Sequence, residues 1–283
     1  MKHFFLIPNH PKDPDLTVTR GVASYLRMHG AEAVIRESRG QGAKRHTDPD
    51  EVPDDTECVI VLGGDGTLIR AAGDLVNRQL PFLGINLGTL GYLAEIDRAS
   101  IYPALDVLLE DRYLIEKRMM LHGDVWHEGK RIQSGVVLND ILVSREGSPR
   151  VITLINYVND MYLNEYRADG IIVSTPTGST GYSLSAGGPI VSPNAELFLM
   201  TPLAAHALNT RSVILPADEN RIRIQIGTGR DGSTEHALAV FDGGSEVSLV
   251  TDDYVEIRRA ERHVKIIKIR NDSFLETLRR KMR

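Results

Sequence analysis

The sequence predicts a two-part chain, an N-terminal α/β domain followed by a C-terminal domain rich in β-strands. Residues 1–117 alternate short apolar runs with amphipathic helical patterns, as in a parallel sheet covered by helices. From about residue 118 the pattern changes to short strand-like runs separated by turn signals. A length of 283 residues accommodates two domains, and the 25 glycines are concentrated in a few short strings.

The elements of the N-terminal domain follow from local sequence. Pro8 ends the first apolar run, and Gly30 ends the helix that follows it. Residues 58–62 are unbroken apolar, which is typical of a strand buried on both faces of a parallel sheet. Strands are expected at residues 4–7, 33–35, 58–62 and 81–85, helices at 16–28, 68–76 and 99–110, and a loop over most of 36–56.

The C-terminal domain contains short apolar and β-branched runs bounded by turn residues. Strands are expected at residues 121–126, 132–143, 151–158, 162–163, 170–174, 213–215, 222–226, 237–241, 247–250, 254–258 and 264–269. The tail, residues 274–282, has the pattern of a short basic helix.

Composition excludes several classes of protein. The chain is 42% hydrophobic and 25% charged with a net charge of -5, so it offers no general basic surface for nucleic acid. No apolar stretch reaches the roughly 18 residues of a membrane span, and the first apolar run reads as a strand rather than a signal peptide. Cys58 is the one cysteine, so an intramolecular disulfide is excluded and a cytoplasmic protein is expected.

The strongest local motif is Gly63-Gly64-Asp65-Gly66-Thr67, between a buried strand and a helix. Glycines let the backbone approach a phosphate, and the helix N-terminus presents free N–H groups to the anion. An acidic residue inside such a loop holds a divalent cation or accepts a proton from an attacking hydroxyl. An Asx-turn that caps the helix explains Asp65 equally well at this stage.

Three further segments carry polar residues where strands end or are interrupted. A second Gly turn ends in Tyr92, whose ring can stack on a base or simply cover the sheet. Asn139 and Asp140 interrupt an apolar run, so they are paired, placed at a bulge, or facing a ligand such as a ribose. Residues 174–188 combine small hydroxyls and glycines, which suits either a polar ligand or a flexible loop.

Other chemistries have no support in the sequence. The nine histidines show no metal-binding spacing, and no Gly-x-Ser-x-Gly motif occurs. Cys58 lies within an apolar strand and is expected in the core.

Four motifs together resemble the signatures of the NAD kinases, in order and in spacing: residues 63–67, Asn139-Asp140, residues 167–170 and residues 175–182. The resemblance covers nearly the whole chain. It implies an α/β domain over residues 1–117, a β-rich NAD-binding domain over 118–270, and a C-terminal helix (271–283) that returns to the first domain. It also implies a homo-oligomer (dimer or tetramer), NAD and ATP (or polyphosphate) as substrates, and Mg²⁺ or another divalent cation.

The resemblance assigns a role to each matching position. Asp65 would be the base that takes the proton of the adenosine 2′-hydroxyl of NAD. The phosphate loop would comprise Gly63, Gly64 and Thr67, and substrate contacts would come from Gly66, Tyr92, Asn139, Asp140, Arg150, Arg167, Asp169, Thr180, Gly181, Tyr182, Ser183, Leu184 and Ser185. The chain departs from the family pattern at Asp140, Gly181 and Gly244, where the family usually has Glu, Ala and a larger polar residue.

Two alternatives remain open from sequence alone. A lipid kinase of the diacylglycerol type shares the first motif and would associate with membranes. A non-catalytic dinucleotide-binding regulatory protein would bind NAD without producing NADP.

Overall fold

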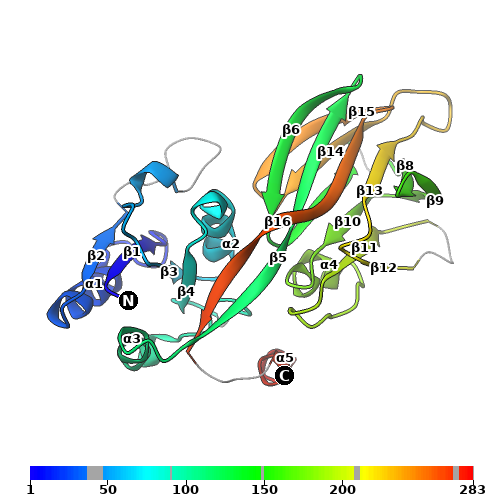
Figure 1. Cartoon of the computed structure of the whole chain (residues 1–283). Helices are drawn as coiled ribbons and strands as arrows, with labels where there is room; N and C mark the ends of the chain where they lie inside the picture. Colours follow the sequence, from blue (N-terminus) through cyan, green and yellow to red (C-terminus); the bar gives the residue numbers. More distant parts are fainter. Residues whose placement is uncertain (37–46, 90, 148–149, 207–210, 270–273, 283) are drawn as a thin grey trace. The chain divides into compact units, whose positions relative to one another are not determined.

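The chain forms two compact units (Figure 1). The computed structural model describes residues 1–36, 47–89, 91–147, 150–206, 211–269 and 274–282. Unit 1 comprises Met1–Arg118 and His263–Arg283, and unit 2 comprises Met119–Arg262. The chain therefore enters unit 2 within strand β5 (Leu114–His127) and leaves it within strand β16 (Tyr254–Lys268). The return to unit 1 comes at His263 rather than at residue 271, because Lys265 and Ile266 of β16 pair with a strand of unit 1.

Unit 1 is a parallel sheet in the strand order β2-β1-β3-β4, extended by the end of β16. Its strands are β1 (His3–Pro8), β2 (Glu32–Ile35), β3 (Cys58–Gly63) and β4 (Pro81–Asn86), and its helices are α1 (Thr17–Met28), α2 (Asp65–Asp74), α3 (Ile101–Leu109) and α5 (Phe274–Lys281). Short 3-10 turns cover Pro49–Glu51, Val76–Arg78 and Arg98–Ser100. All of these strands and helices agree with the sequence prediction to within a few residues at their ends.

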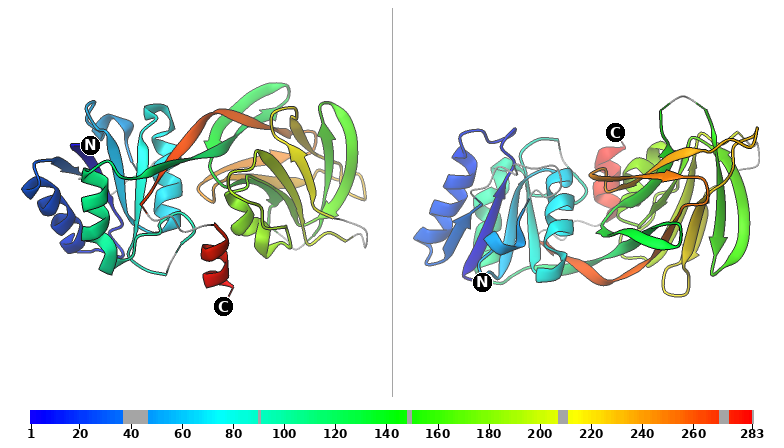
Figure 2. Two further views of the ribbon diagram at one scale, coloured as in Figure 1. Left: turned by 60° about the horizontal axis from the view of Figure 1, so that its bottom comes forward. Right: turned by 90° about the horizontal axis from the view of Figure 1, so that it is seen from above.

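Helices cover both faces of this sheet (Figure 2). The buried side chains of α1 and α3 form one cluster with alternate residues of the strands, including Leu83 and Ile85. Gly84 points to the opposite face, where a Cβ would lie 2.9 Å from Leu68 of α2. Because successive side chains of a strand point to opposite faces of the sheet, α2 covers one face and α1 and α3 cover the other.

The parallel strands bring three loops to one edge of unit 1. β1, β3 and β4 run in the same direction, so the segments after Pro8, Gly63 and Asn86 all leave the carboxyl edge of the sheet. Hydrogen bonds link these segments, from Asn9 N to Leu62 O (2.8 Å) and from Leu87 N to Gly63 O (2.8 Å). Ligands of open α/β sheets bind at this edge.

Unit 2 consists of two antiparallel sheets around one core. The first combines β13 (Ile222–Ile226), β8 (Ile152–Val158) and β9 (Met161–Ala168) with the unit 2 part of β16 and with the β5–β6 hairpin, β6 being Lys130–Val137. The second has the order β12 (Val213–Pro216), β11 (Leu197–Leu203), β10 (Gly170–Ser174), β7 (Asp140–Arg145), β14 (His236–Phe241) and β15 (Ser245–Val250). A short helix, α4 (Tyr182–Ser185), follows a 3-10 turn at Gly178–Thr180.

Several of the later strand predictions need correction. The strands expected at 121–126 and 162–163 are longer, β5 at Leu114–His127 and β9 at Met161–Ala168. The run 132–143 forms two strands, β6 and β7, because the Asp242 carboxylate accepts the N–H groups between them. The runs 254–258 and 264–269 form one strand, β16, since polar side chains between them do not interrupt its backbone. Strand β11 was not predicted. In the described part of the chain, no helix combines the length and the apolar character of a membrane span.

Candidate active site

A small cavity of about 460 Å³ opens at the carboxyl edge of the unit 1 sheet. It is lined by residues of the three loops, of α2 and of α5: Asn9, Lys12, Gly64, Asp65, Gly66, Thr67, Arg70, Thr89, Gly91 and Lys281. The glycine motif predicted to bind phosphate thus lies in a pocket together with the second Gly turn. We call this cavity the glycine pocket.

Backbone N–H groups of the second Gly turn hold the Asp65 carboxylate. Its Oδ2 accepts from Tyr92 N (2.6 Å), and its Oδ1 accepts from Leu93 N (3.1 Å) and Ala94 N (2.9 Å). Asp65 is the first residue of α2, and the N-cap of that helix, Gly64, has no side-chain cap. Asp65 therefore anchors the neighbouring loop rather than its own helix. A carboxylate has about four lone-pair directions, so one acceptor direction is left for a substrate hydroxyl.

Two glycines are required for this packing. A Cβ on Gly91 would overlap the Asp65 carboxylate. A Cβ on Gly63 would lie 2.6 Å from Thr67 Oγ1, which accepts a hydrogen bond from Asn9 Nδ2 (2.7 Å). Since Asn9 follows β1 and Thr67 lies in α2, this bond joins the loop after β1 to the first turn of α2.

Positive charge predominates in the glycine pocket. Lys12, Arg70 and Lys281 line it, and Asp65 is the one carboxylate among its described residues. The Lys12 ammonium lies over both Gly turns, since a Cβ on Gly64 or on Gly88 would be 3.0 Å or 2.8 Å from its Nζ. These groups suit the oxygens of a polyphosphate. They do not fit a resident Mg²⁺, because the carboxylate is already bonded to three N–H groups and cations surround it.

Asn9, Lys12 and Arg70 were not among the predicted site residues. The signal that could have found Asn9 and Lys12 is their position after β1, because the rule that placed ligands beyond β3 applies to every strand of a parallel sheet. Arg70 is five residues after Asp65 on α2 and gave no sequence signal.

Tyr92 is half-buried next to the glycine pocket. Burial and the nearby Asp65 carboxylate raise the pKa of its hydroxyl. Its ring contacts the C-terminal helix, with the ring of Phe274 at 6.5 Å and Lys281 Nζ at 4.1 Å from its centroid.

In unit 2, Asn139 and Asp140 lie next to the Gly-rich segment that follows β10. Thr175 N donates to Asn139 O (2.8 Å), and Thr175 Oγ1 donates to Leu138 O (2.6 Å). Gly178 packs so closely that a Cβ there would overlap the backbone of Asn139. The buried Asn139 Oδ1 has no hydrogen-bond partner among the described residues, which is the expected state of an acceptor reserved for a ligand.

Asp242 is the central acceptor of this second cluster. Its Oδ2 accepts from Leu138 N (2.7 Å), and its Oδ1 accepts from Asn139 N (2.8 Å) and Asp140 N (3.0 Å). Burial raises the pKa of Asp242 to about 6, although the three N–H groups favour its charged form. Burial and the neighbouring Asp242 raise the pKa of Asp140 to about 7. The sequence gave Asp242 no site role, because its backbone partners are about 100 residues away in the chain.

The buried Asp140 predicts an unusual pH dependence of stability. Between about pH 4, the pKa of an unfolded Asp, and about pH 7, the folded chain keeps the Asp140 proton that the unfolded chain loses. The protonated Asp140 carboxyl therefore contributes its full stabilisation below pH 4, and this stabilisation is lost as the pH rises towards 7. Over this range the free energy of unfolding of the wild type should fall by about 2–4 kcal/mol relative to Asp140→Asn, measured by urea denaturation. Asp54→Asn, at an exposed surface ion pair with Arg78, is the matched control variant. A constant difference between wild type and Asp140→Asn would contradict this assignment.

The segment predicted to bind the nucleotide presents most of its residues outward. Tyr182, Leu184 and Ser185 are exposed, while Thr180 and Gly181 are half-buried. Ser183 is buried, and its hydroxyl is hydrogen bonded to Thr201 Oγ1 (3.0 Å). The structure thus directs the Ser183 hydroxyl into the protein.

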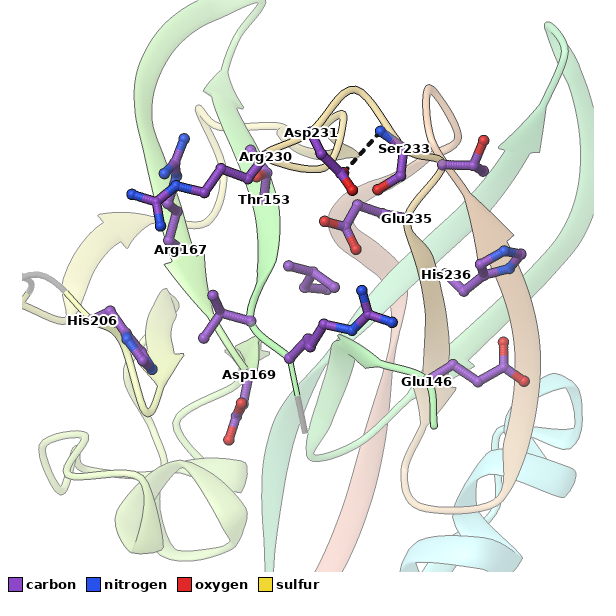
Figure 3. Close-up of a pocket in the computed structure, with 14 residues that line it drawn as sticks. Glu146, Thr153, Arg167, Asp169, His206, Arg230, Asp231, Ser233, Glu235 and His236 are labelled. Atoms are coloured by element: carbon purple, nitrogen blue, oxygen red, sulfur yellow. Dashed lines mark hydrogen bonds between the residues drawn. The ribbon is translucent and has the colours of Figure 1, made fainter. Parts of the chain in front are cut away.

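Arg150, Arg167 and Asp169 line a second, larger cavity of about 1320 Å³ in unit 2 (Figure 3). Asp169 forms an ion pair with Arg145 (2.9 Å), and Arg167 is exposed. Charged and imidazole side chains also line it, among them His206, Arg230, Asp231, Glu235 and His236, together with apolar and hydroxyl side chains such as Val151, Ile152 and Ser233.

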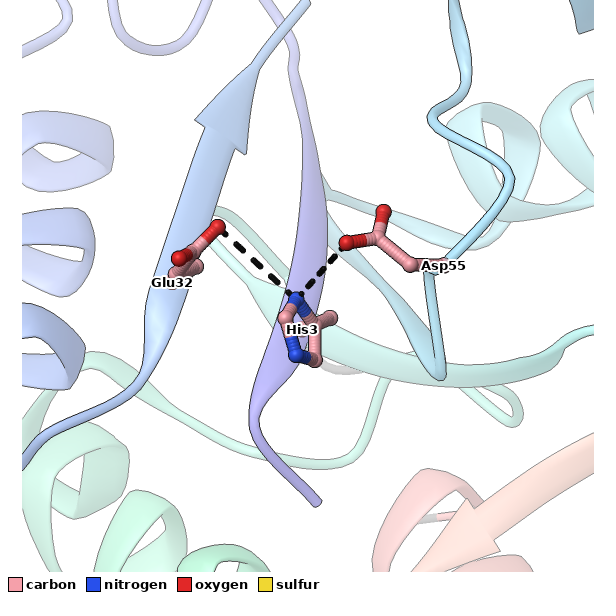
Figure 4. Close-up of side chains that lie close together, drawn as sticks. All are labelled: His3, Glu32 and Asp55. Carbon is pink, nitrogen blue, oxygen red and sulfur yellow. Dashed lines mark ion pairs between the residues drawn. The ribbon is translucent and has the colours of Figure 1, made fainter.

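One group of side chains in the described residues is close enough to share a metal ion: His3, Glu32 and Asp55 (Figure 4). His3 Nδ1 lies 3.0 Å from Asp55 and 3.8 Å from Glu32. His3 and Glu32 begin their parallel strands, at the edge of the sheet opposite to the glycine pocket. This exposed ion-pair group is therefore separate from the pocket.

Phosphoryl transfer from a nucleotide requires cations and backbone donors for the phosphates and an oriented acceptor for the proton of the attacking hydroxyl. The glycine pocket supplies each of these, at the edge of the sheet where α/β proteins bind nucleotides. The fold and the site thus define a phosphotransferase.

Comparisons with known proteins specify the kind of phosphotransferase. The family models described as ATP-NAD kinase N-terminal and C-terminal domains match residues 12–113 and 138–269. The NAD kinases of Lachnospira eligens and Agathobacter rectalis are 45% and 44% identical to the chain, covering all of it and 100% and 99% of the relatives. The chain belongs to the NAD kinase family, and its activity is the phosphorylation of NAD. Neither the lipid-kinase nor the non-catalytic alternative is supported.

Solved structures agree in fold. The yeast NADH kinase complexed with NADH superposes with a TM-score of 0.80 at 25% identity, covering 98% of this chain and 86% of that one. A NAD kinase from Archaeoglobus fulgidus in complex with ATP gives a TM-score of 0.78 at 23% identity, covering 99% of this chain and 98% of that one. The predicted fold, an α/β domain, a β-rich domain and a C-terminal helix, is confirmed.

Proposed function

We propose that the chain transfers the γ-phosphoryl group of ATP to the adenosine 2′-hydroxyl of NAD, with Asp65 as the base. The observation that carries this proposal is the Asp65 carboxylate, oriented by three N–H groups within a pocket of cations. The 2′-oxygen bonds to the γ-phosphorus while its proton passes to Asp65. The bond from the γ-phosphorus to the β–γ bridging oxygen breaks, and ADP leaves.

In unit 1 we assign the phosphates of ATP to the glycine pocket. The backbone around Gly63, Gly64 and Gly66 and the first turn of α2 donate N–H groups to phosphate oxygens. Lys12 and Arg70 neutralise their charge, and Thr67 fixes the loop through Asn9. The divalent cation enters as part of the substrate MgATP, in keeping with a pocket that offers phosphate-binding groups rather than metal ligands.

In unit 2 we assign NAD to Asn139 and Asp140 and to the Gly-rich segment that follows β10. Asn139, with its unpartnered oxygen, and Asp140 accept hydrogen bonds from ribose hydroxyls. The other end of the dinucleotide occupies the larger cavity, at Arg150, Arg167 and Asp169. The segment from Thr180 to Ser185 is assigned to the nucleotide through its exposed side chains and backbone. In unit 1, Tyr92 is assigned as a substrate contact.

The family and Cys58 support two further proposals, on location and on assembly. We place the protein in the cytoplasm, since its single cysteine is buried and requires no oxidising compartment. We also propose a homo-oligomer, either a dimer or a tetramer.

A single assay tests the proposed reaction. Purified protein is incubated with NAD, Mg²⁺ and ATP, and in parallel with NADH or with polyphosphate. We expect NADP and ADP in equal amounts from NAD and ATP, and no product when Mg²⁺ is chelated. Absence of NADP with ATP, together with its formation from polyphosphate, would refute ATP as the donor. Absence of NADP with both donors would refute the reaction itself.

A further inference from the structure

The C-terminal helix α5 packs by one face. Phe274 and Leu278 are half-buried, whereas Leu275 and Arg279, next to them in the sequence, are exposed. Lys281, three residues after Leu278, is exposed as a residue. Its Nζ lies 4.1 Å from the centroid of the Tyr92 ring, which Phe274 also contacts. α5 thus contacts Tyr92 at both ends, through the ring of Phe274 at its first residue and the ammonium of Lys281 at its last.

This contact brings an ammonium group to the glycine pocket. Lys281 lines the pocket together with Lys12 and Arg70, from two other segments of unit 1. Asp65, the carboxylate of the pocket, is held by the N–H groups of Tyr92, Leu93 and Ala94. Three of its about four acceptor directions are therefore taken by N–H groups. No ion pair of Lys281 is present among the described residues.

Lys281 is therefore a cation held near a phosphate site by a weak contact. Cation–π contacts at exposed positions contribute little, and a charge-assisted hydrogen bond to a phosphate oxygen is stronger. A polyphosphate in the pocket can thus draw the ammonium from the Tyr92 ring. The flexible stem of lysine allows this movement without a shift of the helix.

We propose that Lys281 binds the polyphosphate of ATP, so that the C-terminal helix completes the glycine pocket with a third cation. This inference rests on the proposed function, which assigns the phosphates of ATP to that pocket. In the absence of nucleotide, Tyr92 holds the ammonium in place.

The competing explanation is that Lys281 only fixes α5 to unit 1. Lys281→Met separates the two roles, because methionine keeps an unbranched apolar stem on Tyr92 but has no charge. Lys281→Arg keeps the charge. Arg279→Met is the matched control, since it removes one positive charge from an exposed position of the same helix.

Steady-state kinetics of the full chain provide the test. Lys281→Met should raise KM for ATP about tenfold, with KM for NAD unchanged, as expected for loss of one charge-assisted bond to a single substrate. Arg279→Met should stay within about twofold of the wild type in both KM values, and Lys281→Arg, which keeps the charge, should raise KM for ATP less than Lys281→Met does. ATP titration in the absence of NAD should show the same tenfold weakening.

Two results would overturn the proposal. One is a KM for ATP in Lys281→Met equal to that of Arg279→Met. The other is an equal loss for both substrates together with a lower melting temperature, which would indicate a structural role. Wild-type activity with ATP is measured in the same experiment. A wild type that makes NADP only from polyphosphate refutes the proposed donor, whereas an active wild type with an unaffected Lys281→Met variant refutes only the role of Lys281.

Discussion

Asp65→Asn should lower kcat by about 10²–10⁴-fold while the affinity for NAD is retained. The amide has the size of the carboxylate but cannot take up the proton of the 2′-hydroxyl. The loss should appear in kcat at saturating substrates, because the general base acts on the barrier of the chemical step rather than on binding. Initial rates of NADP formation and equilibrium titration with NAD measure the two quantities separately.

Asp65→Asn also weakens the hydrogen bonds that hold the loop at Tyr92, Leu93 and Ala94. Asn has one acceptor oxygen, so the N–H of Tyr92, which bonds to Oδ2 in the wild type, faces an amide NH₂ group or loses its partner. We expect a loss of about 1–3 kcal/mol in the free energy of unfolding. Asp54→Asn, which removes an exposed ion pair with Arg78 (3.2 Å), should leave the rate unchanged and alter the free energy of unfolding by less than about 1 kcal/mol. An Asp65→Asn variant with wild-type kcat would exclude Asp65 as the base.

The sequence was sufficient for most of the fold, for identifiable physical reasons. Unbroken apolar runs such as residues 58–62 predict buried parallel strands, and amphipathic runs ended by glycine predict helices. The sequence failed where a tertiary contact decided the outcome. Residues 132–143 divide into β6 and β7 because the distant Asp242 accepts backbone N–H groups that a continuous strand would have used.

The candidate site was predictable in part. Gly64 and Asp65 line the pocket and could be found because strand, glycines and helix are consecutive in the sequence. Gly91 lines the same pocket, whereas Gly63 ends β3 and is not among the lining residues. The partners of Asp65 could not be found, since its contacts with Tyr92, Leu93 and Ala94 cross about 28 residues of sequence. Lys12 and Arg70 were missed for a related reason. Single Lys and Arg residues form no recognisable sequence motif, and only the folded structure shows that they line one pocket.

Gly91→Ala should lower kcat about 10²-fold although residue 91 has no side chain to take part in the reaction. A Cβ at this position would overlap the Asp65 carboxylate, so either the carboxylate or the 91–94 loop must move. A displacement of about 1 Å at a catalytic group can cost about 10²-fold in rate. The variant is compared with the wild type for kcat and for the free energy of unfolding.

A double-mutant cycle shows whether Gly91 acts through Asp65. If it does, Gly91→Ala should cost little more in an Asp65→Asn background, because the misplaced group has already lost its ability to accept the proton. We therefore expect the kcat of the double variant to lie within about threefold of Asp65→Asn. If the kcat losses of the two single variants multiply in the double variant, Gly91 supports catalysis independently of Asp65, by shaping the 91–94 loop. Gly66→Ala serves as the stability control, since a Cβ there meets nothing within 4 Å. It should leave the free energy of unfolding unchanged or slightly raised, as alanine favours the first turn of α2.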